Sequence, residues 1–142
     1  MVREHPFFQR LTSLGLPVDN YVIGGSGPMF AHGLRKEIGD IDVVASGAAW
    51  SRALELGQPE AAPLGYAQHV VLFDGTVEIL DGWFGYPVDI LILEAEVIEG
   101  IRFMPLTRVL EWKVKFMDSK VGREKDRQDI ALIRRYLQYG EA

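Results

Sequence analysis

Apolar and polar residues in the first part of the chain follow two different periods. Residues 4–14 place phenylalanine and leucine side chains at helical spacing, which predicts an amphipathic helix. Short apolar runs at 21–23 and 38–45 are rich in β-branched residues and predict strands. Between them, Ser26 is a suitable N-cap for a helix over 26–34. The pattern therefore predicts a helix followed by a strand–helix–strand unit.

The middle of the chain contains the clearest hairpin pattern. β-Prone residues at 69–73 and 76–80 flank the Asp-Gly pair at 74–75, which is a strong signal for a tight two-residue turn. We further predict a helix at 48–56, a loop at 58–65, a loop at 81–87 and a strand at 88–93.

The C-terminal part changes from short extended pieces at 96–103 to helical spacing. Residues 106–117 form one helical stripe, with Thr107 as its candidate N-cap. After a break at 119–122, residues 126–138 predict a last helix. This order of elements predicts an α+β (α/β-like) fold with a mixed sheet and a C-terminal helical pair, organised as a single domain over residues 1–142.

Composition and charge narrow the classes of function. The chain has 142 residues, of which 48% are hydrophobic, and this suits a domain with a buried core. Its net charge of -5 argues against general nucleic-acid binding, which favours a basic surface. The absence of cysteine excludes disulfides and thiolate chemistry. No apolar run has the length of a signal peptide or a membrane span, so we expect a cytoplasmic protein without a membrane partner.

Two aspartates one residue apart are the strongest chemical signal in the chain. On a strand, Asp40 and Asp42 project from one face, about 7 Å apart at Cα, while Ile41 and Val43 point into a core. Neighbouring carboxylates repel each other, and a divalent cation relieves that repulsion. The pair is therefore a candidate magnesium site.

A third carboxylate would complete a site for two metal ions. Glu78 lies between apolar residues on the second strand of the hairpin, and it converges with the aspartates if that strand pairs beside theirs. Asp81 follows three residues later, and Asp89 also lies between apolar residues. The sequence leaves the choice among these three acids open.

A glycine turn precedes the aspartates. Gly24 and Gly25 follow a predicted strand, and Ser26 opens a predicted helix. Small residues let the backbone approach a phosphate, and the N–H groups at a helix start favour negative charge. The turn is therefore a candidate phosphate-binding segment, to which Ser26 adds a hydroxyl donor.

Two further features leave alternatives open. Lys113 lies on the apolar face of its helix, where it extends to the surface, pairs with Asp126 or Asp129, or reaches a phosphate. The aromatic segment 83–86 either stacks on a base or packs within its own loop.

Together these residues resemble the nucleotidyltransferase fold superfamily, the group of DNA polymerase β. The family pattern is an apolar residue with a glycine turn, then Asp-x-Asp, then a later acid between apolar residues. The segments that match it are Ile23-Gly24-Gly25-Ser26, Asp40-Ile41-Asp42 and Val77-Glu78-Ile79. Residues 110–113 and 123–129 resemble the tail of small bacterial members, among them abortive-infection type proteins, and the resemblance covers 21–137.

The resemblance implies a nucleotidyltransferase fold whose helices pack mainly on one face of a mixed sheet. It implies two Mg²⁺ ions, with Mn²⁺ as the alternative, held by the catalytic carboxylates of Asp40, Asp42 and Glu78. The implied reaction transfers a nucleoside monophosphate from ATP or another nucleoside triphosphate to an unidentified acceptor, and it releases pyrophosphate. The implied nucleotide-binding residues are Gly24, Gly25, Ser26 and Lys113.

Other functions compete with this interpretation. A non-catalytic nucleotide-binding protein or a toxin–antitoxin component on the same fold keeps the same motifs. An aspartyl-phosphate phosphatase is disfavoured, because Val43 rather than a threonine follows the aspartates and a glycine turn precedes them. A chain of 142 residues leaves no separate acceptor-binding domain. We therefore expect the acceptor in a shallow cleft, at a homodimer interface or on a partner protein.

Overall fold

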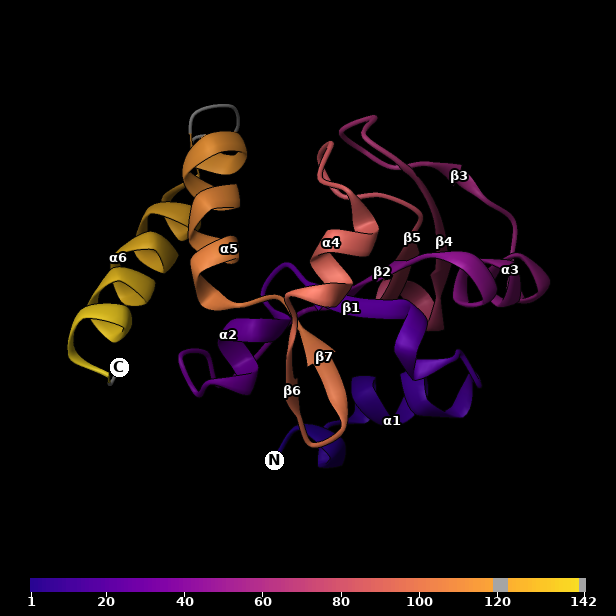
Figure 1. Cartoon of the computed structure of the whole chain (residues 1–142), viewed down its shortest axis with the longest axis horizontal. Coiled ribbons are helices and arrows are strands. Elements are labelled where there is room, and N and C mark those ends of the chain that lie inside the picture. Colours follow the sequence, from indigo (N-terminus) through magenta and orange to yellow (C-terminus); the bar gives the residue numbers. More distant parts are fainter. Residues whose placement is uncertain (119–122, 141–142) are drawn as a thin grey trace.

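The computed structural model describes residues 1–118 and 123–140, and its centre is a seven-stranded mixed sheet (Figure 1). The strands lie in the order β3-β4-β5-β2-β1-β7-β6. Their bounds are β1 Tyr21–Gly24, β2 Ile41–Ala45, β3 Glu60–Ala61, β4 Gln68–Leu72, β5 Val77–Leu80, β6 Glu96–Ile98 and β7 Ile101–Phe103. β2 pairs with β5 and β1 pairs with β7 in parallel, and the remaining pairs are antiparallel.

Six α-helices accompany the sheet in the described part of the chain. They are α1 Pro6–Ser13, α2 Gly27–Ala31, α3 Gly47–Leu56, α4 Val88–Leu93, α5 Leu106–Trp112 and α6 Glu124–Tyr139. Three 3₁₀ turns lie at Val2–Glu4, Val18–Asn20 and Phe73–Gly75, and α5 continues into a π-helical segment at Lys113–Asp118. The expected α+β class, the mixed sheet and the C-terminal helical pair are confirmed; the expected break at 119–122 lies outside the described residues.

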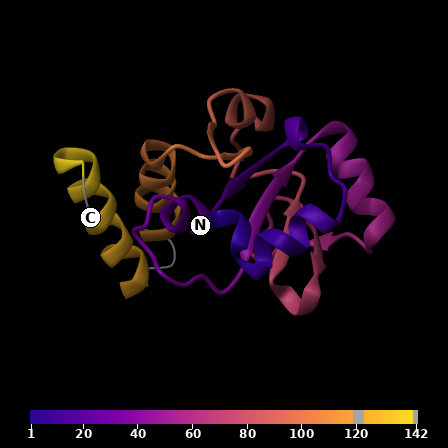
Figure 2. The same ribbon diagram turned by 90° about the horizontal axis from the view of Figure 1, so that it is seen from below.

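The central strands are buried on both faces, so the molecule has two apolar cores. Alternation along β2 sends Val43 to one face and Val44 to the other. The core that contains Val43 packs against α1 and α3, and the core that contains Val44 packs against α4, α5 and α6. Figures 1 and 2 show α1 and α4 on opposite sides of β1, with the α5–α6 pair beside one end of the sheet. The expectation that helices pack mainly on one face is therefore wrong.

Residues 88–93 form helix α4 and not the expected strand. Pro87 begins the segment at the N-cap, and the amide of Glu94 donates to the carbonyl of Ile90, which closes a helical turn. Leu91 alone is fully buried on this helix, where it joins the second core. A short apolar run cannot be assigned to helix or strand from periodicity alone, and here its packing over β1 decides.

Several other boundaries differ from the sequence pattern. Helix α2 ends at Ala31, so the helix expected over 26–34 is shorter, and β3 lies within the expected loop 58–65. The hairpin of β4 and β5 is confirmed, but Leu72 and Val77 are its last pair, so four residues replace the two-residue turn. Pro105 rather than Thr107 takes the N-cap position of α5.

Candidate active site

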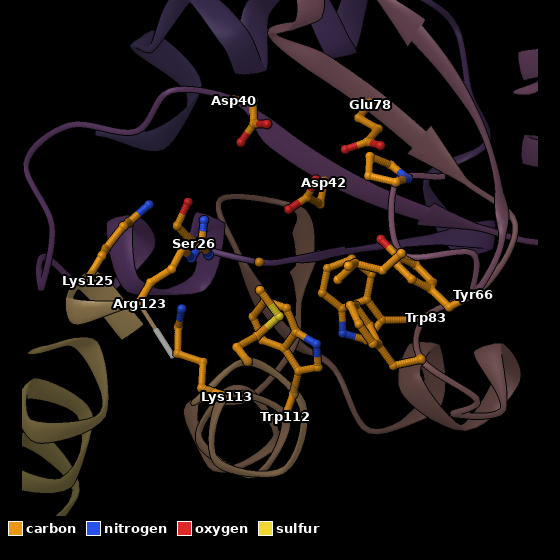
Figure 3. A pocket seen from close by; sticks show the side chains of 15 residues that line it. Ser26, Asp40, Asp42, Tyr66, Glu78, Trp83, Trp112, Lys113, Arg123 and Lys125 are labelled. Carbon is orange, nitrogen blue, oxygen red and sulfur yellow. The ribbon is translucent and has the colours of Figure 1, made fainter. Parts of the chain in front are cut away.

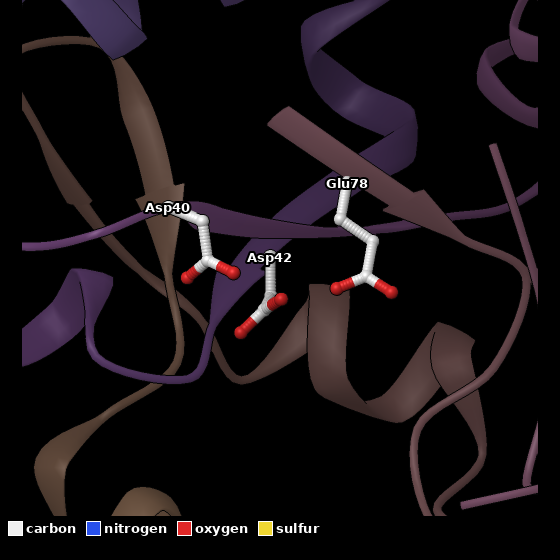
Figure 4. Close-up of side chains that lie close together, drawn as sticks. All are labelled: Asp40, Asp42 and Glu78. Atoms are coloured by element: carbon white, nitrogen blue, oxygen red, sulfur yellow. The ribbon is translucent and has the colours of Figure 1, made fainter. Parts of the chain in front are cut away.

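Three carboxylates converge because β2 pairs with β5 in parallel. Asp42 lies directly opposite Glu78 in that pair, and Asp40 lies just before β2 begins. One carboxylate oxygen from each side chain lies within 4.8 Å of the others (Figure 4). The predicted convergence of Asp40, Asp42 and Glu78 is confirmed, and among the described residues they are the one group of acids and histidines close enough to share a metal ion.

The two competing acids lie apart from this cluster. Asp81 accepts a hydrogen bond from the amide of Gln68, at 2.8 Å, and so ties the end of β5 to the start of β4. Asp89 is an exposed residue in the first turn of α4. The structure therefore selects Glu78 as the third carboxylate of the cluster.

The three acids disfavour each other's ionised forms. Burial raises the pKa of Asp42 well above its usual range, and the charges of Asp40 and Glu78 raise it further. Burial also raises the pKa of Asp40, to which the charge of Glu78 adds. A divalent cation would relieve both effects, because it replaces lost hydration and offsets the repulsion.

The glycine turn lies against the acids. Gly24 is the register partner of Asp42 on the neighbouring strand β1. Gly25 has a φ of +61°, and a Cβ atom there would lie 2.1 Å from Oδ2 of Asp42, so only glycine fits. Ser26 takes the N-cap position of α2 without a side-chain capping bond, and its hydroxyl lines the adjacent cavity.

The acids and the glycine turn form part of the wall of a cavity of about 370 Å³. Figure 3 shows cationic side chains beside Ser26 at one end and aromatic side chains at the other, with the carboxylates above. The aromatic side chains that line it are Tyr66, Trp83, Phe84 and Trp112, and the cationic ones are Lys113, Arg123 and Lys125. The cavity thus brings an acidic, a basic and an aromatic wall together.

The aromatic wall is a packed cluster. Tyr66 stacks on Phe84, with ring centroids 3.9 Å apart, and Trp83 packs against Trp112 at 4.8 Å. The sequence left two roles open for the segment 83–86, and the structure shows both a packed loop and a cavity wall. Burial, together with the charge of Asp42, raises the pKa of Tyr66, so its hydroxyl stays protonated beside the acids.

Lys113 lines the cavity, but its charge is already matched. Its Nζ donates to Oδ1 of Asp126 at 2.9 Å and lies 3.1 Å from Oδ2 of Asp129. Both aspartates are fully buried; Arg123 also pairs with Asp126, and Arg35 with Asp129. Of the alternatives that the sequence leaves open for Lys113, the structure contains the ion pairs. This cluster fixes α6 against α5 and against the segment between α2 and β2.

Lys125 is the cation that sequence reasoning missed. It lies in the first turn of α6, lines the cavity, and has no ion pair among residues 1–118 and 123–140. Its charge lowers the pKa of Asp40, against the larger effect of burial. The tail resemblance over 123–129 includes Lys125 but gives it no role, because its place at the cavity depends on how α6 packs against a sheet formed by residues far earlier in the chain.

His69 is a second residue that sequence reasoning missed. Its Nδ1 forms a hydrogen bond with Oε2 of Glu78, and both side chains are largely buried. The hairpin pattern contained a usable signal, since residues of opposing strands on one face become neighbours once the register is known.

Comparison of the chain with models of known protein families, with curated proteins and with solved structures found no match. The resemblance to nucleotidyltransferases therefore stays a prediction, and the residues of the cavity are what support a function. Within the described part of the chain, no helix combines the length and the apolar character that crossing a membrane requires.

Proposed function

We propose that this chain is a metal-dependent nucleotidyltransferase with a nucleotidyltransferase fold. It transfers a nucleoside monophosphate from a nucleoside triphosphate to an acceptor and releases pyrophosphate. The observation that carries the proposal is the position of the three-carboxylate cluster, which forms one wall of a cavity whose other walls are cationic and aromatic. Each wall matches one part of a metal–nucleotide complex: the metal, the phosphates and the base.

The donor set fits Mg²⁺ or Mn²⁺. Asp40, Asp42 and Glu78 offer only carboxylate oxygens, which are hard ligands, and their ligand atoms lie within 4.8 Å of one another. Burial raises the pKa values of both Asp40 and Asp42, and a bound divalent ion would offset this effect. When bound there, two divalent ions supply stabilisation of the attacking and the leaving oxygens.

The triphosphate lies at the basic end in this proposal. Gly25 brings the backbone close to the acids without a Cβ atom, and Ser26 offers a hydroxyl donor. Lys125, which has no ion pair within the described residues, supplies a positive charge for the departing pyrophosphate, while Lys113 supplies a buried framework through its two aspartates. We therefore assign the direct phosphate contact to Lys125 rather than to Lys113.

The base lies at the aromatic end. Tyr66 and Phe84 present a stacked pair, and Trp112 closes the wall beside them. Aromatic faces stack on any base, so this wall provides affinity for a nucleotide without selecting one. The acceptor then approaches from the side of the acids, where a carboxylate accepts its proton as it attacks the α-phosphorus; Glu78 has this role in the proposal.

The test is transfer of label from a nucleotide to an acceptor pool. The protein is incubated with Mg²⁺, with each α-labelled nucleoside triphosphate in turn, and with a cell extract as the source of acceptors. We expect transfer by the wild type and transfer at background level for Asp42→Asn and Glu78→Gln. Asp89→Asn is the matched control, because it neutralises an exposed acid outside the cluster and should keep full activity.

Two results would reject the proposal. Equal transfer by the wild type and by Asp42→Asn would show that the cluster does not carry the activity. Binding of a nucleotide with Mg²⁺ but no transfer to any acceptor would instead favour the non-catalytic nucleotide-binding protein or toxin–antitoxin component on the same fold.

A further inference from the structure

Glu78 is held from the side that faces away from the aspartates. Nδ1 of His69 forms a hydrogen bond with Oε2 of Glu78, with side-chain exposures of only 12% and 17% respectively. This bond leaves the second oxygen, Oε1, without a contact to the histidine. The carboxylate therefore lies between a neutral or positive ring on one side and two negative side chains on the other.

The sheet dictates this contact. β4 and β5 are antiparallel, with Val71 opposite Glu78 and His69 opposite Leu80. These four side chains share one face, so His69 is the diagonal neighbour of Glu78. The register of β4 against β5 therefore brings His69 to Glu78 from one side, while the register of β2 against β5 places Asp42 on the other.

Glu78 needs such a partner more than Asp42 does. Asp42 is short and is confined by Gly25, whereas a glutamate side chain has an additional rotatable bond. Repulsion by the aspartates would turn a free Glu78 carboxylate away from them. An N–H donor on the outer oxygen limits that rotation, as hydrogen bonds behind metal-binding side chains commonly do.

We propose that His69 is a positioning residue that orients Glu78 toward Asp40 and Asp42 for metal binding. The inference deepens the proposed function and rests on it only in so far as the three carboxylates bind a divalent ion. His69 itself contacts neither metal nor nucleotide in this proposal. It acts through one hydrogen bond, so a side chain that keeps the donor at the same place should replace it.

The experiment measures Mn²⁺ binding by electron paramagnetic resonance, without nucleotide. His69→Leu removes the donor at similar size, and we expect its dissociation constant to rise about 10- to 100-fold. His69→Asn keeps an amide donor near the position of Nδ1, and we expect it to remain within about threefold of the wild type. His69 lines a small cavity together with Gln58, Glu60 and Val71, so the asparagine side chain of this variant has space to adjust toward Glu78.

His32→Leu is the matched control. His32 also contacts a glutamate, Glu96, but this pair lies outside the cavity of the three acids. The control should bind Mn²⁺ as the wild type does, and circular dichroism of all variants should report an unchanged fold. Recovery by asparagine separates orientation of Glu78 from a merely structural role, because a packing defect would also appear in His69→Asn.

Three outcomes overturn the inference. The first is that His69→Leu binds Mn²⁺ as tightly as the wild type does. The second is that His69→Asn binds Mn²⁺ as weakly as His69→Leu does. The third is that the wild type shows no Mn²⁺ binding that is lost in Asp42→Asn. The last outcome rejects the proposed function as well. A wild type that binds Mn²⁺ through Asp42 yet transfers no nucleotide rejects the proposed enzyme alone, because the effects of the His69 variants are read from metal binding.

Discussion

Gly25 and Asp42 lie so close together that there is no room for a Cβ atom at position 25. A Cβ atom on Gly25 would lie 2.1 Å from Oδ2 of Asp42, which is closer than any real contact of that kind. The glycine turn and the acid pair are therefore one unit, because the turn sets the position of the carboxylate as well as the approach of the backbone.

Gly25→Ala should displace the Asp42 carboxylate and abolish most of the metal binding. Gly15→Ala is the matched control, because Gly15 has a similar φ of +73° against +61° at Gly25 but nothing within 4 Å of an added Cβ. Both variants should lose roughly 1–2 kcal/mol of stability from the left-handed backbone. Only Gly25→Ala should weaken Mn²⁺ binding, measured by calorimetry. Equal metal affinity in the two variants would contradict the prediction.

Stability without metal should depend on pH through Asp42. Its folded-state pKa is raised by burial first and then by Asp40, so the native state binds more protons than the unfolded state between the two pKa values. This contribution favours folding at low pH and is lost as the pH rises through the folded pKa. Asp42→Asn should therefore gain stability over the wild type as the pH rises, measured by urea unfolding in EDTA at several pH values.

Saturating Mg²⁺ should instead make the wild type more stable than Asp42→Asn. The metal stabilises the wild type by binding the folded state, whereas Asp42→Asn loses a ligand and gains little. A difference between the two proteins that is constant with pH, with and without Mg²⁺, would contradict both expectations.

Lys125→Ala should weaken nucleotide binding and leave metal binding intact. Lys125 lines the basic end of the cavity on the first turn of α6; it is not a carboxylate ligand, and removal of its positive charge near Asp40 does not disfavour a cation there. Loss of one charge-assisted contact to a phosphate corresponds to about a tenfold rise in the dissociation constant for Mg²⁺–nucleotide. Lys36→Ala is the control, because Lys36 is exposed and does not line this cavity. A fluorescent nucleotide gives the measurement, and equal affinity in both variants would exclude the role of Lys125.

Asp129→Ala should destabilise the fold strongly. Asp129 is fully buried and pairs with Lys113 and Arg35, so its removal leaves a buried ammonium short of one partner. Loss of one member of a buried ion cluster costs about 3–5 kcal/mol. Glu55→Ala removes an exposed pair with Arg52 and should cost less than about 1 kcal/mol. Urea unfolding of both variants gives the comparison; similar midpoints would contradict the assigned role of Asp129.

Asp126, which shares Lys113 with Asp129, has a pKa shift opposite in direction to that of Asp42. Burial raises the pKa of Asp126, but hydrogen bonds from Arg123 and Lys113 outweigh burial and lower it. Its contribution to stability is therefore present at neutral pH and is lost as the pH falls through its folded pKa, which is opposite in sign to that of Asp42.

The local sequence determined the parts of the site that lie within one strand or one turn. Because side chains alternate along a strand, Asp40 and Asp42 had to share a face, and Glu78 had to oppose its apolar neighbours. These constraints act over a few residues, so the sequence alone contains them. The left-handed backbone at Gly25 is local in the same way, whereas its close approach to Asp42 depends on the pairing of β1 with β2.

Tertiary structure decided everything that depends on which segments become neighbours. Parallel pairing of β2 with β5 selects Glu78 over Asp81 and Asp89, and packing over β1 makes 88–93 a helix. The register of β4 brings His69 to Glu78, and the docking of α6 brings Lys125 to the cavity while it matches the charge of Lys113. The physical reason is that register and docking are set by burial summed over the whole core, which no single motif encodes.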